Sequence, residues 1–228
     1  MTPENMASAE ALTRDMAGIG MQLGGRANHE ANVEDTLLRA SEEGMDRGDL
    51  RVLAVLTTWL ASHGSRVNVD RLRTLVDSRG STRTRAYWAA AGRWLAKDRR
   101  WARLVKLHTG EPVELLEVGT GFQLRRHGED SRFVGSSLLV PGNALRDRPA
   151  DVLTPEQLAA RHRAYAWRVV LGPSYRADMW AALEADPNLR PADLARKTYG
   201  SFATAWQAVK DRRLLGRRGI DFVTARRA

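Results

Sequence analysis

The stretch STRTRAYWAAAGRWLAKDRRW, residues 81–101, is the part of the chain from which the fold can be argued. Ser81 offers an N-cap oxygen, and a helical wheel places Tyr87, Ala91, Trp94 and Leu95 on one apolar face. The opposite face carries Arg85, Ala86, Ala89, Arg93, Lys97 and Arg100. Such a face suits the major groove of DNA, because alanines let the backbone approach while guanidinium groups reach phosphates or base edges. An ordinary solvated surface is the alternative interpretation.

The segments on either side of this helix predict a winged helix-turn-helix unit. Residues 49–64 carry Leu53, Leu56 and Trp59 near helical spacing between an aspartate and a glycine, and residues 67–76 predict a shorter helix with Arg71 facing outward. Three helices with a basic third helix are typical of a helix-turn-helix core. Residues 101–107 alternate in polarity, and we expect them to form a wing of strands with residues 113–118 and 122–126.

The C-terminal quarter repeats this three-helix pattern at residues 175–185, 190–197 and 201–215. The word KDRR ends the third helix of both sets, at 97–100 and at 210–213, which favours duplication of a unit. In the last helix we expect Phe202, Ala205, Trp206 and Val209 to face the core and Thr204, Gln207, Ala208 and Asp211 to face outward. The predicted fold class is mainly α with a small β wing, as tandem winged helix or helix-turn-helix domains.

Composition shifts divide the chain into four segments. Residues 1–46 form an acidic N-terminal arm and helix, of which the first 31 or so are expected to be loosely packed. Residues 47–134 form the winged helix-turn-helix domain, residues 135–154 a polar linker, and residues 155–228 the second helix-turn-helix domain.

The charge distribution indicates a polyanionic partner. The 228 residues carry a net charge of +9, although residues 1–49 hold ten acidic and only four basic side chains. An arginine-rich composition can also reflect a genome of high GC content. The chain has no cysteine and shows neither an export signal nor an apolar run long enough to cross a bilayer, so we expect a cytoplasmic location without membrane contact.

The residue inventory favours binding over catalysis. The five histidines are scattered without metal-ligand spacing, so no catalytic group, metal or cofactor is expected. A nuclease that uses Asp98 or Asp211 is the third and least favoured hypothesis. The candidate nucleic-acid-binding residues are Arg83, Arg85, Arg93, Lys97, Arg100, Arg103, Thr204, Gln207, Lys210 and Arg212.

Three phrases carry a resemblance to known proteins: residues 32–64, FQLRRHGEDSRF (122–133), and GPSYRADMW (172–180) followed by ARKTYGSFATAWQAVKDRRLL (195–215). Over residues 32–215 the chain resembles an uncharacterised bacterial winged helix-turn-helix family that is itself similar to AbiEi-type antitoxins. The resemblance implies a DNA-binding autoregulator that counters a nucleotidyltransferase toxin, with Arg83 to Arg100 as the DNA-reading helix. A second helix-turn-helix stands here where those antitoxins have a different domain.

Two functions of different classes follow. The first is a DNA-binding transcriptional regulator, as the autoregulating antitoxin of a toxin pair, with double-stranded DNA, a cognate toxin and a second copy of the chain as partners. The second is a protein-protein interaction module built from winged-helix domains. Steep salt dependence and preference for one duplex would distinguish the first from the second.

Overall fold

The computed structural model describes residues 3–216 and divides the chain into Met1–Pro155, here called unit 1, and Glu156–Ala228, called unit 2. The described residues are mainly helical with one small two-stranded sheet, so the predicted mainly α class is confirmed. Each unit is treated separately below. None of the described helices combines the length and apolarity needed to cross a membrane.

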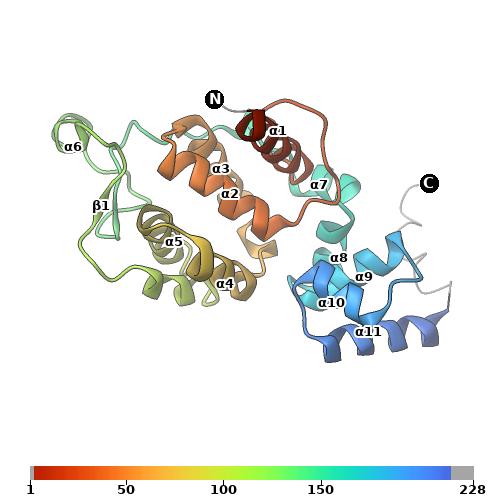
Figure 1. Cartoon of the computed structure of the whole chain (residues 1–228). Coiled ribbons are helices and arrows are strands. Elements are labelled where there is room, and N and C mark those ends of the chain that lie inside the picture. Colours follow the sequence, from red (N-terminus) through yellow and green to blue (C-terminus); the bar gives the residue numbers. More distant parts are fainter. Residues whose placement is uncertain (1–2, 217–228) are drawn as a thin grey trace. The chain divides into compact units, whose positions relative to one another are not determined.

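In unit 1, helix α2 packs against α1, α3, α4 and α5 (Figure 1). Its elements are α1 (Pro3–Gly18), α2 (Val33–Asp46), α3 (Leu50–His63), η1 (Gly64–Arg66), α4 (Val69–Arg79), α5 (Thr82–Trp94), η2 (Trp101–Leu107), β1 (Val113–Glu114), α6 (Thr120–His127), β2 (Leu138–Leu139) and η3 (Pro149–Asp151). The predicted helix at 49–64 is confirmed as α3. Asp49 caps it by accepting from the backbone N–H groups of Arg51 and Val52.

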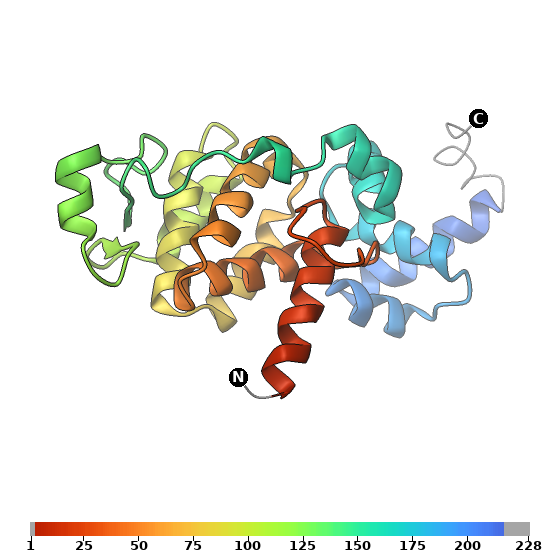
Figure 2. The same cartoon turned by 90° about the horizontal axis from the view of Figure 1, so that it is seen from above.

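The prediction of a β wing after α5 is wrong. Residues 101–107 form the 3-10 helix η2, which packs against α5, and residues 122–126 lie inside helix α6. Trp101 and Leu104 are buried three residues apart, a spacing that matches the three-residue turn of a 3-10 helix. The short strand β1 pairs in parallel with β2, whereas a wing hairpin would be antiparallel. Helix α6 lies at the edge of unit 1 (Figure 2).

The N-terminal arm is packed, which corrects the expectation of a loose segment. Ile19 and Met21 are completely buried beyond the end of α1. The indole Nε1 of Trp59 in α3 donates to the backbone carbonyl of Ile19 at 2.7 Å. In α1, Asp15 accepts a hydrogen bond from Arg39 of α2 at 2.8 Å. The scattered apolar residues of the arm therefore belong to the core of unit 1.

The segment expected as a linker, residues 135–154, contributes β2, η3 and buried apolar residues that include Leu138, Val140, Leu145 and Leu153. The Oγ of Ser137 donates to the backbone carbonyl of Ala86 at 2.8 Å. Just before the segment, the ring centroid of Phe133 lies 6.4 Å from that of Tyr87 and 6.1 Å from that of Trp94. This segment therefore covers one side of α5.

Glycine lets η2 approach α5 closely. A Cβ atom at Gly92 would lie 2.8 Å from the Leu104 Cβ and 2.8 Å from the Trp101 backbone oxygen. Gly92→Ala is expected to destabilise unit 1 by about 1–3 kcal/mol, because backbone and Cβ atoms must move apart. Gly121→Ala is the matched control, since a Cβ in α6 would meet only the end of Arg125 at 3.8 Å. Urea denaturation followed by circular dichroism measures both changes, and an equal effect would contradict the close packing.

The residues of unit 2 that the structure describes form helices. They are α7 (Pro155–Arg161), α8 (Arg163–Leu171), α9 (Tyr175–Ala185), α10 (Pro191–Thr198) and α11 (Phe202–Leu215). Helices α7 and α8 are separated at His162, whose Nδ1 accepts from the backbone N–H of Tyr165 and so caps α8. Met179, Leu183, Leu194, Ala205 and Ala208 form the apolar core between α9, α10 and α11.

Candidate nucleic-acid interface

Helix α5 is a buried core helix. Every residue from Ala86 to Gly92 is buried, including Ala86 and Ala89, which were expected on the exposed face. The helix ends at Trp94, seven residues before Trp101, so the cations beyond it are not on one helical face. The prediction of a solvent-facing helix through residue 101 is therefore wrong. The cause lies in the chain that follows, since η2 and the segment 133–140 cover the alanine-rich face.

The N-terminal end of α5 is occupied by an acidic side chain. Asp46 of α2 accepts from the Ser81 Oγ at 2.7 Å and from the Thr84 Oγ1 at 3.1 Å. A carboxylate here is favourable for the helix dipole, and it would repel a DNA phosphate approaching the same end. The N-terminal end of α5 is thus not open in the way that the end of a reading helix is.

Two of the arginines predicted to contact DNA instead donate hydrogen bonds to backbone carbonyls within unit 1. The Arg83 Nε donates to the Met45 carbonyl at 2.8 Å, and its Nη2 donates to the Leu115 carbonyl at 2.9 Å. The Arg85 Nη2 donates to the Asp77 carbonyl at 2.7 Å. These guanidinium groups join neighbouring segments of the same unit.

The remaining predicted cations of unit 1 are dispersed. Arg93 and Lys97 are exposed, whereas Arg100 binds Asp98 at 2.5 Å and also donates to the Ser65 carbonyl at 3.0 Å. The Arg100 hydrogen bonds hold the pKa of the Asp98 carboxyl below its usual range. Arg103 pairs with Asp70, and this hydrogen bond raises the pKa of the Arg103 guanidinium.

Arg71 was also expected to face outward, and that expectation is wrong. Its side chain is 1% exposed and forms an ion pair with Glu34 at 3.1 Å.

Helices α10 and α11 of unit 2 are joined by a short turn. The turn contains only Tyr199, Gly200 and Ser201. Tyr199 adopts a left-handed conformation with φ of 56°, and the Ser201 hydroxyl caps α11 by accepting from the Thr204 backbone N–H. A Cβ at Gly200 would lie 2.3 Å from the Cε of Met179, so the turn is pressed onto α9. A three-residue turn that contains glycine is typical of helix-turn-helix units.

The face that α11 buries differs from the one expected. Ala205 and Ala208 are buried, whereas Trp206 is 50% exposed and Phe202 is 59% exposed. The expectations that Trp206 lies in the core and that Ala208 faces outward are therefore wrong. Two sets of residues share helical spacing here: 202, 205, 206 and 209, and 205, 208, 209 and 212. The second set packs inward because two alanines allow close approach.

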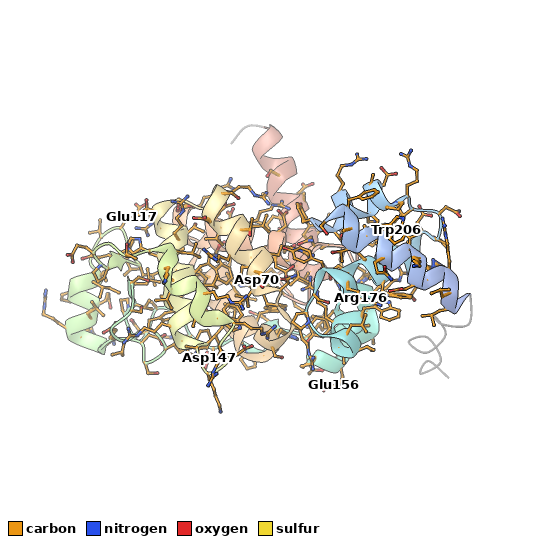
Figure 3. The ribbon with its side chains drawn as sticks, turned by 90° about the horizontal axis from the view of Figure 1, so that it is seen from below. Asp70, Glu117, Asp147, Glu156, Arg176 and Trp206 are labelled. Carbon is orange, nitrogen blue, oxygen red and sulfur yellow. The ribbon has the colours of Figure 1, made fainter. Side chains whose placement is uncertain are left out.

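The predicted site residues of α11 fall on different sides of the helix. Gln207 and Lys210 are exposed, Thr204 is partly exposed, and Arg212 donates to the Leu183 carbonyl at 2.6 Å and so supports α9. The Lys210 Nζ lies 5.3 Å from the ring centroid of Trp206 (Figure 3 labels Trp206).

Sequence reasoning missed three exposed residues of the same surface, Phe202, Trp206 and Arg213. We define the α11 face as Phe202, Ala203, Trp206, Gln207, Lys210 and Arg213. The alternative helical spacing at residues 205, 208, 209 and 212 was the sequence signal that could have revealed this exposed face.

Electrostatics distinguish unit 2. In the sequence, residues 156–228 carry fourteen Lys and Arg against seven Asp and Glu, so unit 2 accounts for +7 of the net +9. A net positive charge of this kind favours a polyanionic partner. Among the residues that the structure describes, no group of three or more His, Asp or Glu side chains is placed to hold a metal ion.

The α11 face is therefore the candidate interface, since it joins an exposed helix, a tight preceding turn and the more basic unit. No protein-family model, no curated protein and no solved structure matches the chain. The choice of the α11 face therefore rests on its geometry and charge alone.

Proposed function

We propose that this chain is a transcriptional regulator that binds double-stranded DNA through the α11 face of unit 2. The observation that carries the proposal is the exposed helix α11 behind the short turn at residues 199–201, packed on α9. In a helix-turn-helix protein the second helix enters the major groove and places its N-terminal residues on base edges. Gln207 and Lys210 supply an amide for base edges and a cation for phosphates.

The two exposed lysines of the chain's repeated KDRR words provide a matched test. Lys210→Ala is expected to weaken duplex binding several-fold and to lower the slope of log affinity against log salt by about one, because one phosphate contact is lost. Lys97→Ala removes the same charge from unit 1 and is expected to leave the slope unchanged.

The measurement is fluorescence anisotropy of a labelled duplex from the chain's own upstream DNA, titrated with the full chain over a salt series. The resemblance to autoregulating antitoxins makes this duplex the first to test, with a scrambled duplex as its companion. Equal losses for the two lysine variants would contradict binding through α11.

Protein binding is the second candidate, and the half-exposed Phe202 and Trp206 favour it. Aromatic side chains on an exposed helix are common anchors at protein interfaces. In that case Trp206→Ala would abolish association with a protein partner, and Lys210→Ala would leave duplex affinity unchanged.

A further inference from the structure

Three side chains of unit 2 form a chain of hydrogen bonds that ends on the α11 face. The Arg176 Nη2 of α9 donates to the Asp211 Oδ2 at 2.7 Å. The Gln207 Nε2 of α11 donates to the Asp211 Oδ1 at 2.6 Å. Both carboxylate oxygens are thus engaged, one by each helix (Figure 3 labels Arg176).

This arrangement fixes which way the Gln207 amide points. An ionised carboxylate only accepts hydrogen bonds, so the group that faces Asp211 must be the amide nitrogen. The Gln207 Oε1 consequently faces away from Asp211, and the second N–H of the nitrogen stays available beside it. Asp211 itself is 19% exposed and anchored to α9, which limits its own movement.

We infer that Asp211 is a positioning residue that holds the Gln207 amide to read adenine in the major groove. This inference rests on the DNA binding proposed above. Adenine presents N7 as an acceptor next to the N6 amino donor, which matches one free N–H and one free oxygen of a glutamine. Guanine presents two adjacent acceptors and would require the amide to turn away from Asp211.

The inference makes a prediction that a purely structural role for Asp211 would not produce. Asp211→Ala is expected to reduce discrimination at one A·T position roughly five- to hundredfold, because the freed amide can rotate. Affinity for non-specific duplex is expected to stay equal or increase, since a negative charge near the phosphates is removed. Asp211→Glu keeps an acceptor-only group within reach and is expected to restore part of the discrimination.

The experiment uses the full chain and a duplex library with a randomised core. Selected sequences define the preferred duplex, and anisotropy titrations then compare it with its single-base variants for wild type, Gln207→Ala, Asp211→Ala and Asp211→Glu. Asp193→Ala is the matched control, because Asp193 is another arginine-paired acid of unit 2, bonded to Arg190 and Arg196. Thermal unfolding of each variant accounts for changes in stability.

The outcomes separate the two proposals. Loss of the same adenine preference in Gln207→Ala and Asp211→Ala, but not in Asp193→Ala, is the expected result. A wild-type preference that persists in Asp211→Ala overturns the positioning role and leaves DNA binding intact. Absence of saturable duplex binding by the wild type overturns the proposed function, and the adenine inference with it.

Discussion

Replacing Asp178 with alanine is expected to destabilise unit 2 by about 3–5 kcal/mol, because it removes a carboxylate that accepts two hydrogen bonds from the buried Arg168 guanidinium. The Arg168 Nε and Nη2 donate to the two Asp178 oxygens at 2.8 and 2.9 Å, and the two side chains are 1% and 7% exposed. This bidentate pair joins α8 to α9, on which α10 and α11 pack. Hydrogen exchange of the full chain should show faster exchange in residues 156–216.

Two controls make the prediction specific to burial. Asp193→Ala removes an acid that is solvent-accessible and paired only at the surface, and it is expected to change stability little. The double variant Arg168→Met/Asp178→Leu removes both buried charges and is expected to recover much of the stability. If the double variant is no more stable than Asp178→Ala, then the buried charge of Arg168 is not the cause of the loss.

Local signals predicted the beginnings of helices well. Asn32, Asp49 and Ser201 each cap a helix through a side-chain oxygen, as their residue types and spacing indicate. Such caps depend on three or four neighbouring residues, so the sequence alone contains the information. The breaks at residues 64 and 80, beside glycines, follow from the same kind of local signal.

The inward face of a helix depends on partners far away in the chain. Ala86 and Ala89 fit an exposed face as well as a buried one, and the residues that bury them come from η2 and from segment 133–140. The same ambiguity affected α11, where two overlapping spacings competed. Alternation of polarity in 101–107 predicted a strand, although buried residues three apart also fit the 3-10 helix that forms.

Only part of the candidate site could be predicted from the sequence, because the rest depends on segments that are distant in the chain. Gln207 and Lys210 are exposed as expected, because they lie opposite the buried alanines of α11. The hydrogen bond between Gln207 and Asp211 lies within reach of sequence reasoning, since the residues are four apart on a helix. The hydrogen bond from Arg176 of α9 to Asp211 could not be predicted from the sequence, because it depends on how the two helices pack.

Glu34→Ala is expected to have a comparable effect on unit 1, a loss of about 3–5 kcal/mol. In α2, Glu34 is completely buried, with its Oε2 bonded to the Arg71 Nη1 at 3.1 Å and its Oε1 accepting from the Asn68 backbone N–H at 2.8 Å. Truncation therefore removes a carboxylate that binds the buried Arg71 guanidinium, and it removes the acceptor of a buried backbone donor at the start of α4. Urea denaturation followed by circular dichroism measures the loss.

The adjacent acid provides the control, since Asp35 also pairs with an arginine of α4. The Asp35 carboxylate bonds Arg79 at 2.8 Å, but the two side chains are 22% and 47% exposed, so Asp35→Ala is expected to cost less than about 1 kcal/mol. The two substitutions remove the same charge from neighbouring positions of one helix and differ chiefly in burial. Equal losses would show that helix-end electrostatics, to which both acids contribute, dominate over the buried pair. A large loss for Glu34 alone would establish that α2 and α4 are joined through that pair.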